Sequence, residues 1–128
     1  MKKTVLRKYA RLIAKMGGNV QKGQDVIIQA SLDQPEFVTM VAEECYACGA
    51  RRVRVEWSHQ PLTKVTQKKC SLKTLSTMDE WEIAKLKHMS ENLPVRIYLE
   101  SDDPDGLKGV NQEKMSKASQ AQIGRAHV

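Results

Sequence analysis

Two cysteines three residues apart, Cys45 and Cys48, have the C-x-x-C spacing of redox dithiols and of half a zinc site. A redox dithiol needs an attacking sulfur with a lowered pKa, typically at the amino end of a helix. This pair falls at the carboxyl end of a predicted helix, where the helix dipole disfavours a thiolate. A zinc site needs two more ligands at suitable spacing, and Cys70 forms no second pair with either His59 or His88. The pattern therefore favours buried or half-buried thiols over a redox or metal site.

The candidate bases and acids form no recognisable constellation. His88 lies in a predicted helix among lysines, and neither it nor His59 is tied by spacing to a nucleophile. The acidic residues of SDDPDG, namely Asp102, Asp103 and Asp105, are typical of a turn because no further calcium ligands follow at the required spacing. No G-x-G-x-x-G or G-x-x-x-x-G-K-[ST] motif occurs in the chain. Residue spacing alone reveals no active site.

The net charge of +6 is concentrated in one segment. Residues 1–24 contain seven basic residues and no acidic ones, whereas the remaining 104 residues contain 14 basic and 15 acidic ones. A basic helix can contact phosphates, lie on a membrane, or present a solvated face next to an acidic partner surface. The last alternative is the commonest, and Tyr9, the segment's one aromatic residue, gives little support for nucleic-acid stacking.

Apolar residues alternate between helical and extended spacing along the chain. Val5, Leu6, Tyr9, Leu12, Ile13 and Met16 are spaced as one face of a helix that ends at Gly17-Gly18. The predicted strands are Asp25–Ala30, Arg52–Trp57 and Val95–Leu99. Further helices are predicted around Phe37–Tyr46 with Pro35 in the first turn and Gly49 at the end, more weakly in the polar stretch through Cys70, at Asp79–Met89, and at Asn111–Gln120.

This alternation favours an α/β fold with a mostly parallel small sheet and helices packed on its faces. In the second strand, Val53, Val55 and Trp57 alternate with polar residues, so one face of it should be buried. The 128 residues suffice for a single small core. We expect residues 1–121 to form one α/β domain.

The last six residues, Ile123–Val128, match nothing in the preceding pattern. The codons CAG ATC GGA AGA GCA CAC GTC TGA would encode Gln122–Val128 and a stop, and they resemble a common sequencing-library adapter. We therefore expect residues 122–128 to be a non-native tail that has no part in the fold. The alternative is a natural loose terminus.

The amino terminus and the cysteine content indicate a cytoplasmic protein. Basic residues interrupt every apolar window after MKKTV, so neither a signal peptide nor a membrane span is predicted. Three cysteines, an odd number, argue against a secreted disulfide framework.

Several stretches, in order, resemble the amino-terminal domain of the aminopeptidase T and aminopeptidase S family. They are LRKYARLIAKMGGNVQKGQDVIIQA, FVTMVAEECYACGARRVRVEW, the DP of SDDP, LKGV and NQEKM, and with the looser stretches between them they span nearly all of residues 5–118. Cys45 and Cys48 depart from the small or apolar residues that are more usual there, and KKCSLKTLSTMDEW is a loose match.

The resemblance implies a metal-dependent aminopeptidase that removes amino-terminal residues from peptides and forms a homodimer. In such enzymes a pair of divalent ions, whether zinc, cobalt or magnesium, polarises the scissile carbonyl and supplies hydroxide at neutral pH. The family's metal ligands lie in a carboxy-terminal domain, so no catalytic, cofactor-binding or metal-binding residue is assigned to this chain. The resemblance thus implies an inactive fragment that lacks the catalytic domain. A small basic nucleic-acid-binding module or a stand-alone interaction module is the alternative.

Overall fold

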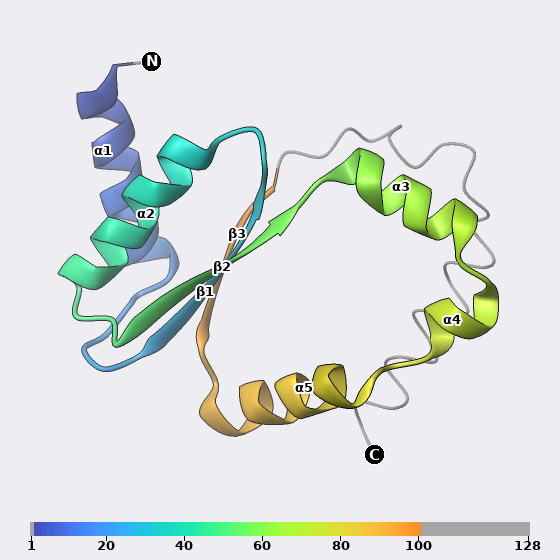
Figure 1. Cartoon of the computed structure of the whole chain (residues 1–128). Helices are drawn as coiled ribbons and strands as arrows, with labels where there is room; N and C mark the ends of the chain where they lie inside the picture. Colours follow the sequence, from blue (N-terminus) through green and yellow to red (C-terminus); the bar gives the residue numbers. More distant parts are fainter. Residues whose placement is uncertain (1, 101–128) are drawn as a thin grey trace. The chain divides into compact units, whose positions relative to one another are not determined.

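The computed structural model describes residues 2–100. Residues 2–59 and 94–100 form one compact unit, and residues 60–93 belong to a second. The acidic cluster at Asp102, Asp103 and Asp105, the predicted helix Asn111–Gln120 and the tail at 122–128 lie outside the described residues. The elements are α1 (Lys3–Leu12), the π-helical turn η1 (Ile13–Gly17), β1 (Asp25–Ser31), α2 (Pro35–Ala47), β2 (Arg52–Ser58), α3 (Gln60–Lys69), α4 (Leu72–Ser76), α5 (Glu80–Asn92) and β3 (Val95–Leu99) (Figure 1).

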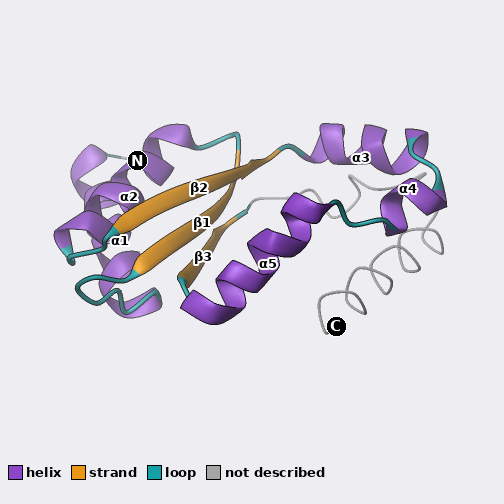
Figure 2. Cartoon of the chain, turned by 60° about the horizontal axis from the view of Figure 1, so that its bottom comes forward, coloured by secondary structure: helices purple, strands orange, loops and turns teal. Residues whose placement is uncertain are grey.

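The three strands form a parallel sheet in the order β2-β1-β3, so β1 is central (Figure 2). In the register, Ile28 of β1 lies between Val55 of β2 and Ile97 of β3. The predicted α/β class and the parallel sheet are confirmed. All three predicted strands are present, and β1 and β2 each extend one residue beyond the prediction.

One face of the sheet is buried beneath α1, η1 and α2. Val26, Ile28 and Ala30 alternate along β1 and therefore point to the same face. They share a core with Ala10 and Ala14 of the first helical segment and with apolar residues of α2, chiefly Val38, Val41 and Cys45. Both helical segments consequently pack on the same side of β1.

The apolar residues of the first helix were predicted to form one face, but only some of them are buried. Leu6 and Ile13 pack against the core, but Tyr9, Leu12 and Met16 are exposed. Residues advance by about 100° each along an α-helix, so the two sets lie on adjacent sides of the helix and α2 with the sheet covers one of them. Trp57 was likewise expected to be buried with Val53 and Val55, but it is exposed near the end of the edge strand β2.

The turns before β1 and β2 are held together at the amino ends of these strands. Gly49 has φ +98°, and its amide oxygen accepts a hydrogen bond from the backbone N–H of Gly23 at 2.8 Å. Beside it, Arg51 donates two hydrogen bonds to the carboxylate of Asp25, with Nε–Oδ1 at 2.6 Å and Nη2–Oδ2 at 2.8 Å. These contacts join the two turns where β1 and β2 begin, next to the paired residues Asp25 and Arg52.

The second unit contains α3, α4 and α5, so the weakly predicted helix before Cys70 is confirmed and a short fourth helix is added. The Ser71 hydroxyl caps α4 by accepting from the N–H of Thr74 at 3.1 Å. Asp79 and Glu82 form a reciprocal capping box at the start of α5, which begins one residue after the predicted boundary. Leu93 then ends α5 in the left-handed conformation, with φ 45°.

Replacing Gly49 with alanine should destabilise the first unit. A Cβ there would lie 3.0 Å from the Lys22 Cα, and the positive φ disfavours any side chain. We expect Gly49→Ala to lower the free energy of unfolding by about 1–3 kcal/mol. Gly17→Ala is the matched control because a Cβ at Gly17 meets nothing within 4 Å. Urea unfolding followed by circular dichroism measures both; equal stability of the two variants would contradict the constraint at Gly49.

Candidate functional site

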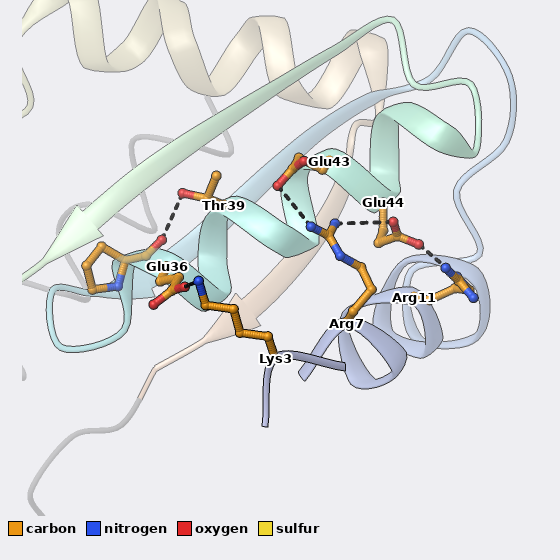
Figure 3. A network of polar contacts seen from close by, with 8 residues as sticks. Lys3, Arg7, Arg11, Glu36, Thr39, Glu43 and Glu44 are labelled. Atoms are coloured by element: carbon orange, nitrogen blue, oxygen red, sulfur yellow. Dashed lines mark hydrogen bonds and ion pairs between the residues drawn. The ribbon is translucent and has the colours of Figure 1, made fainter. Parts of the chain in front are cut away.

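Basic side chains of α1 form ion pairs with acidic side chains of the neighbouring helix α2 (Figure 3). Arg11 Nε donates to Glu44 Oε1 at 2.9 Å. Arg7 reaches two glutamates, with Nη1 3.5 Å from Glu44 Oε2 and Nη2 3.4 Å from Glu43 Oε1. A further pair joins Lys3 Nζ to Glu36 Oε1 at 3.5 Å near the amino end of both helices. We call these six residues the ion-pair seam.

Glu44 is the centre of the ion-pair seam. Its side chain is 12% exposed, and its carboxylate accepts hydrogen bonds from both Arg7 and Arg11. The hydrogen bond from Arg11 is the main reason that the pKa of Glu44 is lowered; partial burial opposes it, and the positive charges of Arg11 and Arg7 add to the lowering. Glu44 is therefore ionised near neutral pH and acts as a structural anion rather than as a proton-transfer group.

The ion-pair seam changes the meaning of the chain's basic first segment. Lys3, Arg7 and Arg11 form ion pairs with glutamates of the same chain, so part of the segment's positive charge is balanced within the fold. The commonest expectation for such a segment was a solvated face next to an acidic partner surface; in the structure the acidic residues belong instead to α2 of the same chain. The sequence contained a signal for this contact. Lys3, Arg7 and Arg11 recur every four residues and so share one side of α1, and Glu36 and Glu43 are seven residues apart and so share one side of α2.

The C-x-x-C pair does not form a redox site. Cys45 is fully buried in the core, Cys48 is half-buried, and both are free thiols. Burial raises the pKa of Cys45 to about 11, with smaller contributions from Cys48 and Glu44. A thiolate is the nucleophile in dithiol exchange, so this pKa leaves Cys45 unreactive. The prediction of buried thiols at a helix end is confirmed.

The two candidate histidines lie in different units of the chain. His88 lies on α5 in the second unit, where the Asn92 amide nitrogen is 3.1 Å from its Nδ1 and donates to its backbone oxygen at 2.8 Å. His59 follows β2 in the first unit. Within residues 2–100, no three His, Cys, Asp or Glu side chains gather in a way that could hold a metal ion. In the same residues, no helix has the length and apolar character needed to cross a bilayer.

The sheet face opposite α1 and α2 carries polar side chains on all three strands. Arg54 and Arg96 occupy equivalent positions on the two edge strands, and Glu56, Gln29 and Tyr98 form the next row. The Gln29 amide donates to Glu56 Oε2 at 3.3 Å, and the Arg96 guanidinium lies 5.9 Å from the centre of the Tyr98 ring. These groups are arranged for mutual contact and provide no nucleophile paired with a base.

Comparison with known proteins decides the family. The family model described as thermophilic metalloprotease (M29) matches residues 2–126. The chain belongs to that family.

Several relatives extend the comparison. Aminopeptidase AmpS of Bacillus subtilis (strain 168) is 32% identical over 121 residues, which are 94% of this chain and 29% of AmpS. Aminopeptidase T of Thermus thermophilus is 29% identical over 116 residues, covering 91% of this chain and 28% of that protein. The solved structure of wild-type AmpT from Thermus thermophilus superimposes with a TM-score of 0.80 at 27% identity, covering 98% of this chain and 32% of AmpT. This metalloprotease-family chain thus spans about 29% of the length of AmpS.

Coupling between Arg11 and Glu44 should be measurable and pH-dependent. A double-mutant cycle of unfolding free energies with Arg11→Met and Glu44→Gln should give a stabilising interaction energy of about 0.5–1 kcal/mol at pH 7. The pKa of Glu44 is lowered in the folded chain, so this stabilisation is present near neutrality and is lost as the pH falls through the lowered pKa. A cycle on Lys3 and Glu36 is the control and should give less, because both side chains are largely exposed. Coupling that grows on acidification would contradict the assignment.

Cys45 should resist alkylation in the native chain. Its pKa of about 11 and its complete burial leave neither thiolate nor access at neutral pH. Iodoacetamide labelling followed by peptide mass spectrometry should show Cys48 and Cys70, both half-buried, modified before Cys45. Labelling in urea is the control and should reach all three. Rapid native alkylation of Cys45, or a disulfide to Cys48 under mild oxidant, would refute the buried-thiol assignment.

Proposed function

We propose that this chain is the amino-terminal α/β part of a metal-dependent aminopeptidase that removes amino-terminal residues from peptides. One observation carries the proposal: 94% of the chain aligns with aminopeptidase AmpS, yet the aligned part is 29% of that protein. The family model, which matches residues 2–126, supports metalloprotease chemistry in the whole enzyme. The chain's own contribution is the folded unit built on β1, α1 and α2.

The described residues do not fit a catalytic metal centre. Hydrolytic metal sites need several carboxylate or histidine ligands around one open coordination position, and residues 2–100 hold no such group of three. We therefore assign no catalytic step to these residues. In the proposed enzyme the divalent ions, whether zinc, cobalt or magnesium, are held by the polypeptide that the longer relatives have in addition to the matched segment.

The proposal extends to assembly and location. Peptides are the proposed substrates, a homodimer is the proposed form of the whole enzyme, and the cytoplasm is its proposed compartment. The three described cysteines are all free thiols, which is consistent with a reducing compartment. The ion-pair seam supports a protein role for the first helix over a nucleic-acid role, because it neutralises three of the basic side chains.

The purified chain should show no aminopeptidase turnover by itself. Supplied with zinc, cobalt or magnesium, it should release no amino acid from a leucine-derived chromogenic substrate, because the described residues lack a ligand cluster. Full-length AmpS of Bacillus subtilis, assayed in the same buffers, is the positive control. Metal-dependent release by this chain, abolished by a chelator and restored by the ion, would falsify the placement of the catalytic centre outside it.

A further inference from the structure

The outward side of the first helical segment carries a row of exposed apolar side chains. Val5, Tyr9, Leu12 and Met16 follow one another at intervals of four, three and four residues, so they lie along one side of α1 and η1. Their exposed fractions rise from 38% at Val5 to 76% at Met16. We call these four residues the outer stripe.

The outer stripe is distinct from the helix side that holds the fold together. Leu6, Ala10 and Ile13 lie on the neighbouring side and pack into the core with α2 and the sheet. Single exposed apolar residues are ordinary on a protein surface, but a contiguous series over three helical turns marks an interaction surface. The first unit therefore does not need the outer stripe for its own core.

Two lysines give the outer stripe a charged edge. Lys8 and Lys15 are seven residues apart and lie on the helix side between Leu12 of the outer stripe and Arg11 of the ion-pair seam. Within the described chain, the ion pairs of the first helix involve Lys3, Arg7 and Arg11 rather than these two lysines. The surface offered to a partner is apolar along its centre and positive along one side.

Charge argues against two other occupants. A second copy that packed antiparallel on the stripe about a two-fold axis would bring the lysines of both copies to the same edge, and like charges at close range are unfavourable. A membrane surface generally requires clusters of about 4–8 basic residues for stable attraction to anionic lipids. On this helix, Arg7 and Arg11 are already bound to glutamates of α2, which leaves too few.

We propose that the outer stripe is an intramolecular docking surface for an amphipathic segment with acidic residues along one edge. That segment belongs to the part of the longer polypeptide that has no counterpart here, since this chain spans about 29% of AmpS. Apolar side chains of the segment cover Leu12 and Met16, and its carboxylates lie opposite Lys8 and Lys15. The inference rests on the proposed function, because it requires the chain to be part of a larger aminopeptidase.

The test compares one substitution in two contexts. Leu12→Gln with Met16→Gln is introduced into this chain and into a chimera in which this chain replaces the matched 121 residues of AmpS. Glutamine keeps the helix propensity, and the stripe is already exposed in this chain, so its melting temperature should change by less than about 2 °C. The chimera should lose roughly 3 °C or more, because there the substitution removes buried apolar contacts. Equal shifts in both contexts would overturn the proposal.

Matched controls separate docking from general surface effects. Val65→Gln removes an apolar side chain whose exposed fraction, 54%, equals that of Leu12, and it should not distinguish the two contexts. Lys8→Glu with Lys15→Glu should destabilise the chimera more than this chain, in which only the loss of Lys15 from the last helical turn costs stability, whereas Lys22→Glu should affect the two contexts equally. A chimera that is stabilised or unchanged by reversing both stripe lysines would overturn the acidic edge of the proposed segment.

Other measurements keep the proposal open to refutation if the chimera does not fold. Overlapping 18-residue peptides that cover the rest of AmpS are then titrated with the labelled chain. At least one should bind and be released by Leu12→Gln with Met16→Gln, and binding by none would overturn the proposal. Dimers of this chain that sediment as such and are lost on substitution of the stripe would overturn the proposal and make a second copy the occupant. Binding to phosphatidylserine vesicles that depends on the stripe would likewise overturn it and make a membrane the occupant.

The two levels of inference fail separately. Aminopeptidase activity of the folded chimera tests the proposed function, while the context-dependent melting shift tests docking. An active chimera with no such shift would remove the docking surface and leave the function standing. An inactive chimera with the shift would support docking and count against the function.

Discussion

The structure depends on one constraint, the burial of one face of the central strand β1. Both of its neighbours are parallel strands, so its backbone groups are paired on each side and its side chains alone decide what covers it. Val26, Ile28 and Ala30 require an apolar cover, and α1, η1 and α2 together supply it. Because both helical segments must lie on the same side of the sheet, they also lie beside each other, and this proximity creates the ion-pair seam.

The ion-pair seam shows why net charge is a poor guide to partners until the charges are placed. The first 24 residues carry seven of the chain's basic side chains and no acidic ones, which is typical of a surface for anions. Packing against α2 instead gives Arg7 and Arg11 carboxylates from the same chain. What remains available on the first helix is an apolar surface with two lysines, which favours a protein partner.

Membership of the family does not by itself place a catalytic site in this chain. The match over residues 2–126 and the superposition on AmpT establish the family and the fold of the matched segment. Metal-dependent hydrolysis needs a cluster of ligands, and the described residues contain none. Within the described residues, α1 and α2 cover and stabilise the sheet.

The sequence by itself determined the class of fold, the three strands and most of the helices, but not α4 or the π-helical turn η1. β-branched runs predicted all three strands, helical spacing and Pro35 predicted α2, and the helix-end position of Cys45 predicted an inert thiol. The tertiary structure alone decided which apolar residues of α1 are buried and which acids meet its basic side. Local periodicity fixes the side of a helix on which a residue lies, but the neighbour that covers that side comes from distant sequence. Leu6 and Leu12 are therefore alike in the sequence and differ in burial only after α2 and β1 have packed beside them.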